Sequence, residues 1–341
     1  MTEDSHEVTI VKLLKDASNK GTYMSGQKIS DSLGLSRTAV WKHIENLRAE
    51  GYEIESSSKK GYRLKENDKK NDEKGFIFSD TEILSSLKTK YIGRELTFLA
   101  ETESTNKDAF ALARDGAREG SAVIAVTQKG GKGRLGRKWH SPEGRNIYTS
   151  IVLRPKMAPM EVQSITLMAA VAVADTIAHF IGEAPNVKWP NDILVKGRKI
   201  SGILTEMKTD TDSVDFIILG IGMNVNMAAD DFPEDIRKIA SSIEIQKGKK
   251  VSLSEVTSSL YSSIEKWYEV FTSKGSEEVF KKWNEYFESS GKEVKVTAQN
   301  EQDSFSGLCL GIDERGALQV RDKDGNTRTV IAGDVERVRN A

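Results

Sequence analysis

The stretch Ser121–Lys138, SAVIAVTQKGGKGRLGRK, decides how the middle of this chain folds. Its first half, Ser121–Gln128, is an apolar run typical of a buried strand. Its second half satisfies the pattern GxGxxG, which marks a dinucleotide site only where a helix begins at the glycines. Trp139-His140-Ser141-Pro142 follows instead and does not begin a helix. The stretch therefore predicts a buried strand that leads into a flexible loop, Gly130–Lys138.

The loop Gly130–Lys138 holds four cations among its glycines. Cations this close repel one another unless an anion lies among them, and glycines let backbone N–H groups approach a ligand closely. We therefore interpret the loop as an anion-binding clamp, with a solvated basic turn as the alternative. A P-loop is excluded, because GxxxxGK[ST] occurs nowhere in the chain.

Two strand patterns further along predict a β-hairpin. Ile193–Val195 and Lys199–Glu206 flank the turn Lys196-Gly197. Lys199 begins the second strand beside Ser201-Gly202, where little side-chain bulk leaves room for a ligand. A surface lysine on a hairpin is the alternative interpretation.

The central part of the chain holds another buried strand and one long helix pattern. Phe216–Gly222 is an apolar run that ends beside Asn224, and asparagines there suit a base or ribose edge as well as an ordinary turn. Met160–Ile181 is apolar and rich in alanine, so we expect it to be the central packing element. Together these patterns predict a mixed α/β domain.

Composition and charge limit the class of protein. At 341 residues the chain is long enough for two or three domains. Cys309 is the single cysteine, which excludes an intramolecular disulfide and fits a reducing cytoplasm. The four histidines have no metal-ligand spacing, so no metal site is expected. We find no apolar run near the roughly 18 residues that cross a bilayer, and expect no membrane association.

A charged stretch, Glu66–Gly75, contains no apolar residue and is typical of a linker. A second change of pattern follows near residue 289, where short alternating runs begin. These changes predict an N-terminal domain at 1–66, a linker at 67–75, a central domain at 76–289 and a C-terminal domain at 290–341. In the last domain, four or five short strands from Lys292 onward predict a small SH3-like barrel.

The N-terminal domain has the pattern of a winged helix-turn-helix. Helical spacing from Val8 to Ala17 precedes a short helix at Gly26–Leu33, the stop at Gly34 and a third helix that Ser36 would cap. Two short strands around Ser56–Lys60 predict the wing. The candidate DNA contacts are Arg37, Thr38, Lys42 and His43 on the third helix, with Lys59, Lys60 and Arg63 on the wing.

Charge supports DNA binding only weakly, and a small helical domain that binds protein is the alternative. Residues 1–66 hold 11 Lys and Arg against 10 Asp and Glu, which gives 11 − 10 = +1. One copy should therefore bind DNA poorly, and we expect a dimer on two half-sites of an operator.

Five short motifs in order give the chain a family resemblance. They are Ser104-Thr105-Asn106, Gly131–Trp139, Lys188-Trp189-Pro190-Asn191-Asp192, Lys199-Ile200-Ser201-Gly202 and Gly220-Ile221-Gly222-Met223-Asn224. In this order they resemble the biotin–protein ligases, and the N-terminal module resembles the bifunctional subgroup that also represses the biotin operon. The resemblance implies an α+β multidomain fold: a winged helix-turn-helix, a mixed α/β ligase domain like the class II synthetases, and an SH3-like barrel.

The resemblance also implies the chemistry. Biotin and ATP, with Mg²⁺, give biotinyl-5′-AMP, and biotin then passes to a lysine of the biotin carboxyl carrier protein or another biotin-dependent carboxylase. The adenylate-bound form is expected to be a cytoplasmic homodimer on operator DNA. By position, the residues implied to bind biotin are Ser104, Thr105, Asn106, Gln128, Lys132, Gly133, Arg134 and Lys199. Lys199 and Arg134 are also implied to be catalytic, and Trp139, Asn191 and Asn224 to bind the adenylate.

One position departs from the family pattern, and two other functions stay open. The family commonly has arginine where Lys132 stands, and a lysine lacks the planar fork that binds phosphate in two places. We expect weaker retention of the adenylate. The alternatives are a ligand-sensing winged-helix transcription factor without catalysis, and a lipoate–protein ligase, whose pocket should be longer and less polar.

Overall fold

The computed structural model describes residues 4–65, 76–210, 212–297, 304–331 and 333–337. Its contacts divide the chain into two compact units. The first comprises Met1–Lys88 with Val251–Ser258, and the second Thr89–Lys250 with Ser259–Ala341. The expected linker at 67–75 lies outside the described residues. The domain boundaries drawn from the sequence stay a prediction.

The first unit contains a winged helix-turn-helix, as the sequence predicts. Its elements are α1 (His6–Asn19), α2 (Gly26–Leu33), α3 (Arg37–Ala49), β1 (Ile54–Ser57) and β2 (Gly61–Leu64). The hydroxyl of Ser36 accepts a hydrogen bond from the Ala39 N–H and caps α3, and Gly34 ends α2 in the left-handed conformation. β1 and β2 pair antiparallel to form the wing.

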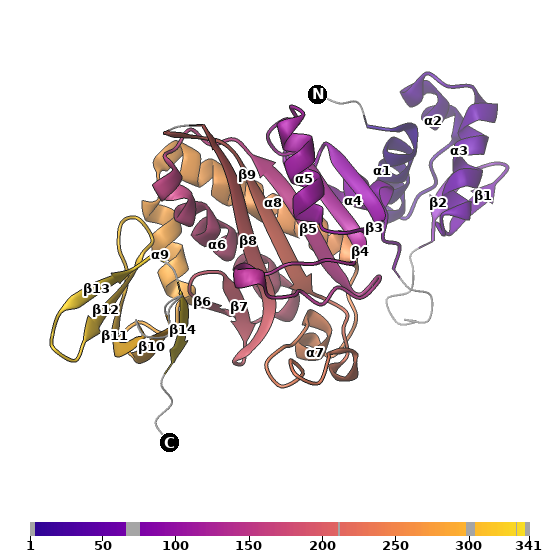
Figure 1. The fold of residues 1–341 in the computed structure, drawn as a ribbon. Helices are drawn as coiled ribbons and strands as arrows, with labels where there is room; N and C mark the ends of the chain where they lie inside the picture. The colour runs from indigo at the N-terminus through magenta and orange to yellow at the C-terminus, as the bar shows by residue number, and fades with distance from the viewer. Residues whose placement is uncertain (1–3, 66–75, 211, 298–303, 332, 338–341) are drawn as a thin grey trace. The chain divides into compact units, whose positions relative to one another are not determined.

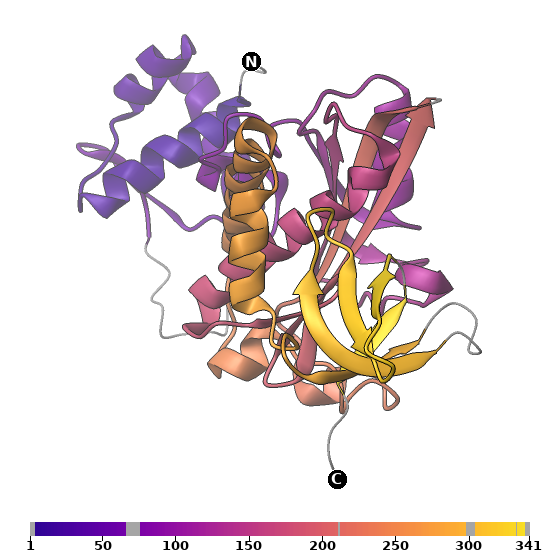
Figure 2. The same cartoon turned by 90° about the vertical axis from the view of Figure 1, so that its left-hand side faces the viewer.

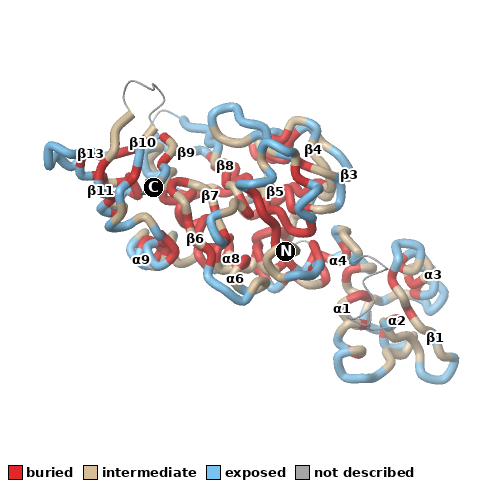
Figure 3. The backbone as a smooth tube through the Cα atoms, turned by 90° about the horizontal axis from the view of Figure 1, so that it is seen from below, coloured by how far each residue is buried: buried red, intermediate tan, exposed pale blue. Residues whose placement is uncertain are grey.

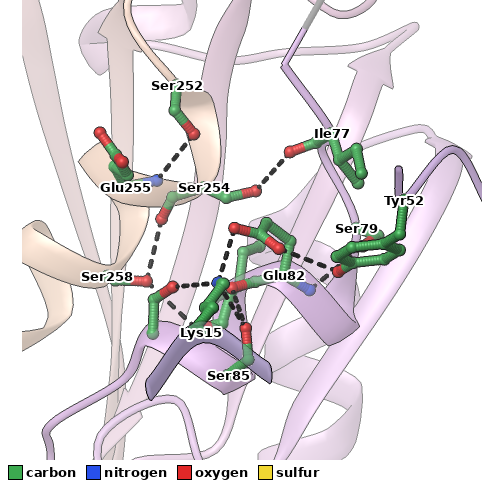
Figure 4. Close-up of polar contacts among 12 residues, drawn as sticks. Lys15, Tyr52, Ile77, Ser79, Glu82, Ser85, Ser252, Ser254, Glu255 and Ser258 are labelled. Atoms are coloured by element: carbon green, nitrogen blue, oxygen red, sulfur yellow. Dashed lines mark hydrogen bonds and ion pairs between the residues drawn. The ribbon is translucent and has the colours of Figure 1, made fainter. Parts of the chain in front are cut away.

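A polar cluster joins α1 to a helix beyond the linker, α4 (Asp80–Ser86), in the same unit (Figure 4). The Lys15 ammonium lies 2.7 Å from Glu82 Oε1 and donates to the Ser85 and Ser86 hydroxyls at 2.8 and 2.9 Å. The Tyr52 hydroxyl donates to the other Glu82 oxygen at 2.9 Å. Burial, and then the charge of Glu82, raise the pKa of Tyr52, so the hydroxyl stays a donor.

The second unit is built on a seven-stranded mixed sheet. Its strands are β3 (Leu96–Thr102), β4 (Ala122–Gln128), β5 (Asn146–Leu153), β6 (Asn186–Lys188), β7 (Asp192–Val195), β8 (Arg198–Asp210) and β9 (Ser213–Asn224). They lie in the order β3-β4-β5-β9-β8-β7-β6, and β3 and β4 pair in parallel. Every residue of β5 is buried, and Figure 3 shows buried residues gathered along the central strands.

Helices cover both faces of this sheet. Ser150 of β5 donates to Asn106 of α5 (Thr105–Arg114) at 2.6 Å. The next residue back, Thr149, lies 2.6 Å from the Tyr261 hydroxyl of α8 (Leu253–Lys274). Because neighbouring strand residues point to opposite faces, α5 covers one face and α8 the other. Figure 1 shows α6 (Val162–Ile181) beside α8, with α7 (Ile243–Lys247) and α9 (Glu277–Tyr286) nearby.

The long apolar helix corrects one expectation. An 18-residue window within Pro159–Ile181 has a mean hydropathy of 1.7, which is long and apolar enough to cross a membrane. The expectation that no such run exists is therefore wrong. Since 72% of the window is buried inside the protein, the helix also fits the central packing role predicted for it.

The C-terminal part of the second unit is a five-stranded antiparallel sheet, consistent with the expected SH3-like barrel (Figure 2, yellow). Its strands are β10 (Glu293–Thr297), β11 (Phe305–Ile312), β12 (Leu318–Asp322), β13 (Thr327–Val330) and β14 (Asp334–Arg337). The Trp189 indole donates to the Gly316 carbonyl at 3.2 Å. A Cβ added at Gly316 would lie 2.6 Å from Leu167, so this turn packs closely on α6.

Candidate functional site

Three glycines form the floor of the candidate site. Gly220 and Gly222 lie two residues apart on β9, and Gly202 of β8 pairs with Gly222, so all three face the side covered by α5. A Cβ at Gly220 would lie 2.0 Å from Asn106 Oδ1, and one at Gly222 would lie 2.5 Å from the Trp139 ring. The missing side chains are therefore what lets two predicted site residues lie against the sheet.

One end of the site is a buried polar network at the start of α5. Gln128 Oε1 accepts hydrogen bonds from the Thr105 N–H and hydroxyl at 3.0 and 3.2 Å. Asn106 donates to Glu206 at 2.7 Å and accepts from Ser150 at 2.6 Å. Thr105 and Asn106 are both buried. Three of the residues predicted to bind biotin, Thr105, Asn106 and Gln128, thus belong to one hydrogen-bonded group at the start of α5.

Two members of this network, Ser150 and Glu206, were not predicted from the sequence. Ser150 lies inside the apolar run of β5, and Glu206 ends a strand pattern, so neither stands in a recognisable motif. Ser104 is buried as the N-cap of α5, but its side chain makes no capping hydrogen bond.

The other end of the site holds the predicted catalytic lysine. Lys199 Nζ lies 2.7 Å from Asp192 Oδ1, in an ion pair whose angle does not suit a hydrogen bond. The same ammonium lies 5.3 Å from the centre of the Trp139 ring, within range of a cation–π interaction. Trp139 Nε1 is buried and has no hydrogen-bond partner among the described residues. Asp192 was missed as a site residue, although it stands inside a quoted motif.

The loop between the two ends is folded back on itself. The Gly133 N–H donates to the Arg137 carbonyl at 2.7 Å, and the Trp139 N–H to the Gly131 carbonyl at 2.9 Å. The turn places Leu135 at φ 55°, a left-handed conformation that costs a residue with a Cβ roughly 1–2 kcal/mol. The loop is therefore a closed hairpin in this structure.

Two of the four cations of the loop, Arg134 and Arg137, have partners outside it. Arg134 donates to Asn191 Oδ1 at 3.2 Å and to the Gly333 carbonyl at 3.4 Å. Burial lowers the pKa of Arg134. Arg137 forms a hydrogen-bonded ion pair with Asp334, which raises the pKa of the guanidinium. Asp334 is the first residue of β14 and Gly333 directly precedes it, so the start of this strand supplies an anion to the loop.

Within the described part of the chain, two further predicted residues, Lys132 and Asn224, make no side-chain contact with these groups that would define a role. Lys132 is exposed and pairs across the hairpin with Lys138, next to a half-buried Gly133. Asn224 is buried and donates to the Ser241 carbonyl at 3.0 Å, so its amide is held in the fold. The roles assigned to these side chains stay predictions.

The predicted DNA contacts divide into exposed and paired side chains. Arg37, Thr38, Lys42, Lys59 and Lys60 are exposed, with the Lys60 ammonium 5.7 Å from the centre of the Tyr23 ring. The remaining two candidates form intramolecular pairs. His43 Nδ1 lies 2.6 Å from Glu7, and Arg63 donates to Glu55 at 2.9 Å.

The fold joins a winged helix-turn-helix to a mixed α/β domain with a polar, glycine-floored site, and comparison with known proteins assigns this combination to the ligases that carry a DNA-binding domain. Residues 98–224 match the Biotin/lipoate A/B protein ligase family, 8–63 an HTH domain, and 289–338 the Biotin protein ligase C terminal domain. The chain is 40% identical to the bifunctional ligase/repressor BirA of Bacillus spizizenii, over 96% of this chain and 97% of the relative. It is 29% identical to that of Escherichia coli, over 98% of each.

A solved structure of a biotin protein ligase supports the same family. The biotin protein ligase of Aquifex aeolicus in complex with biotin and ATP matches with a TM-score of 0.62 and 28% identity, over 72% of this chain and all of that one. The chain belongs to the family of bifunctional biotin ligase/repressors. The expected fold class, ligase activity and family are therefore confirmed.

Proposed function

We propose that the site described above joins biotin to ATP, releases pyrophosphate and holds the biotinyl-5′-AMP that forms. The observation that carries this assignment is the Lys199–Asp192 ion pair beside Trp139, above a floor of bare glycines. Lys199 would stabilise the negative charge that develops between the biotin carboxylate and the α-phosphate. Asp192 would hold the ammonium in place before the substrates arrive.

The buried network of Thr105, Asn106 and Gln128 suits the polar ring system of biotin, together with Ser104. A buried urea needs paired donors and acceptors, because an unpaired polar group costs roughly 1–3 kcal/mol. This polarity favours biotin over the longer, less polar acyl chain of lipoate.

The loop would bind the carboxylate and phosphates through Lys132, the Gly133 backbone and Arg134, with Trp139, Asn191 and Asn224 on the adenylate side. A closed loop would also keep water from the mixed anhydride, which hydrolyses readily. Mg²⁺ would arrive with the nucleotide, bound mainly by its phosphates. Within the described parts of the chain, no group of three His, Cys, Asp or Glu side chains is placed to hold a metal.

In the second half-reaction, a lysine of a biotin carboxyl carrier protein or another biotin-dependent carboxylase would attack the carbonyl of the anhydride. AMP leaves, and an amide bond forms to biotin. Lys132 is expected to retain the adenylate less well than arginine, because it binds phosphate as a point charge. The residual leak would label lysines on bystander proteins.

The winged helix-turn-helix would bind an operator through Arg37, Thr38, Lys42 and His43 on α3, and through Lys59 and Lys60 on the wing. Its small net charge requires two copies on two half-sites, so the adenylate-bound form is expected to be a homodimer. Such a ligase and repressor would act in the cytoplasm. Sedimentation with and without biotin and ATP tests this coupling, which fails if association does not change.

One experiment tests the enzymatic proposal directly. The full chain is incubated with ATP, Mg²⁺, biotin and a carrier protein, and pyrophosphate release and carrier labelling are measured, with Lys199→Ala and Arg134→Ala as comparison variants. We expect both signals from the wild type alone. Absence of pyrophosphate would leave a ligand sensor without catalysis. Equal labelling from lipoate would favour a lipoate ligase.

A further inference from the structure

The exposed face of α3 carries a large apolar side chain among its polar ones. The Trp41 side chain is 51% exposed, although tryptophan is usually well buried. Val40, Ile44 and Leu47 pack the opposite face of α3 into the core of the first unit. Trp41 lies four residues after Arg37 and three after Thr38, spacings that place side chains on one face of a helix.

Trp41 has no packing role that explains this placement. Among the described residues, its indole makes no hydrogen bond, ring contact or cation–π contact. The Trp41 side chain is not part of the buried face of α3, and the helix is capped by Ser36. The indole therefore leaves apolar surface exposed to water in the free protein, on the helix that a helix-turn-helix places in the major groove.

Charge alone gives this module little attraction for DNA. Its net charge is 11 − 10 = +1 over residues 1–66. Several cations are also neutralised within the first unit, namely Lys12, Lys15, Arg48 and Arg63, by Asp4, Glu82, Glu45 and Glu55 respectively. Since phosphate contacts supply most non-specific affinity, base contacts are needed to make an operator bind better than other DNA.

We propose that Trp41 reads a thymine in the major groove by laying its indole against the 5-methyl group. The proposal rests on the DNA-binding function proposed above. The thymine methyl is the apolar feature of the major groove, and apolar side chains recognise it by contact. Exposed Arg37 and Lys42 flank Trp41 along the helix and complement phosphates, which favours DNA over an apolar protein surface.

The test starts from DNA that the protein itself selects. The full chain, loaded with biotin and ATP, is used to enrich duplexes from a random-sequence library. Binding of the enriched duplex is then measured for the wild type, Trp41→Ala and Trp41→Phe, at several salt concentrations. The same proteins are tested on copies in which each thymine in turn is replaced by deoxyuridine, which lacks only the methyl group.

We expect Trp41→Ala to lose about tenfold in affinity, within the cost of one mismatched base pair, and Trp41→Phe to lose less. One thymine per half-site should show a methyl effect in the wild type that disappears in Trp41→Ala, as contacting groups do in a double-mutant cycle. The dependence on salt should be unchanged in Trp41→Ala, whereas the control Lys42→Ala should lower its slope by about one. Carrier biotinylation by Trp41→Ala should equal that of the wild type, which shows an intact ligase domain, and hydrogen exchange of the α1 and α3 amides should be unchanged, which shows a folded winged helix-turn-helix.

Several outcomes would overturn the proposal. Wild-type affinity in Trp41→Ala, or methyl effects that are identical in both proteins, would remove Trp41 from the base contacts. Weaker self-association of Trp41→Ala without DNA would place Trp41 in a protein interface instead. If the loaded wild type enriches no duplex, the DNA-binding function itself fails. If it enriches one and only the methyl effect is absent, that function stands and the role of Trp41 falls.

Discussion

The ligase site and the exposed face of α3, which carries Arg37, Trp41 and Lys42, are both polar, but the first is hydrogen-bonded within the protein and the second is open to solvent. In the ligase site, Thr105 and Asn106 of α5 and Gln128 of β4 hydrogen-bond their neighbours before any ligand is present, and the first two are buried. On α3, Arg37 and Lys42 extend into solvent. The difference teaches where single changes matter. Substitutions in the ligase site should affect folding and chemistry together, whereas those on the exposed face of α3 should matter only once DNA is bound.

The largest expected effect is at the charged end of the site. Lys199→Ala should lower the rate of pyrophosphate release by on the order of 10²–10³, the usual cost of one group that stabilises developing charge. Lys196→Ala is the matched control, because Lys196 is on the same hairpin and pairs with Glu183 at the surface. Equal rates for the two variants would place Lys199 among ordinary surface lysines.

The glycine floor gives the next largest effect. In Gly220→Ala the new methyl would lie 2.0 Å from Asn106 Oδ1, so the network must move. We expect a loss of about 1–3 kcal/mol in the free energy of unfolding, typical of overpacking, and at least a tenfold rise in the KM for biotin. Denaturant unfolding and biotin titration measure the two effects.

A second variant locates the clash. If Asn106 is the group displaced, Asn106→Ala combined with Gly220→Ala should be no less stable than Asn106→Ala alone. Additive losses would mean that Gly220 is needed for another reason.

Much of the fold around both functional surfaces can be predicted from the sequence, because its turns and strands are set by residues close together in the chain. Gly34 and Ser36 predict the helix-turn-helix, and Lys196-Gly197 predicts the hairpin that presents Lys199. Asn106 and Gln128 are identified only through the family resemblance. Their partners Ser150 and Glu206 come from strands whose register no local pattern reports. Pairing of distant strands depends on the whole core, so these contacts were beyond prediction.

The loop Gly130–Lys138 shows the same limit of prediction for a contact between residues even farther apart in the sequence. The cations of the loop predicted a nearby anion, and from the sequence the substrate was the one anion suggested for that place. The anion present in the fold is Asp334, 197 residues away from Arg137. The sequence predicted a loop at these residues but not its hairpin shape, in which Leu135 has a positive φ.

Breaking the Arg137–Asp334 ion pair, which joins the loop to the C-terminal sheet, should have a smaller effect on the enzyme. Asp334→Asn releases Arg137 and should loosen the closed loop, which raises labelling of a bystander protein about 1.5- to fivefold. That range corresponds to the roughly 0.2–1 kcal/mol of an exposed ion pair. Asp324→Asn, a change of the same kind in the β12–β13 turn, should leave bystander labelling unchanged. No increase in Asp334→Asn would show that the ion pair does not help retain the adenylate.

The smallest expected effect lies in the first unit and concerns pH. Burial opposes ionisation of Glu7, yet its hydrogen bond with His43 keeps its pKa below the ordinary 4.5. A depressed carboxyl pKa stabilises the fold above 4.5, and that stability is lost as pH falls through the folded-state value. Burial raises the pKa of Glu50 instead, so its contribution is present below 4.5 and lost as pH rises.

The two residues therefore predict opposite slopes. Glu7→Gln should remove up to about 1 kcal/mol of stability at pH 6 and almost none at pH 3, while Glu50→Gln should gain stability at pH 6. Hydrogen exchange of α1 and α3 amides in the full chain measures both. Parallel slopes would mean that the Glu7–His43 contact contributes nothing to holding α3 on α1. In that case α3 would be held on α1 by the core packing of Val40, Ile44 and Leu47 without help from this contact.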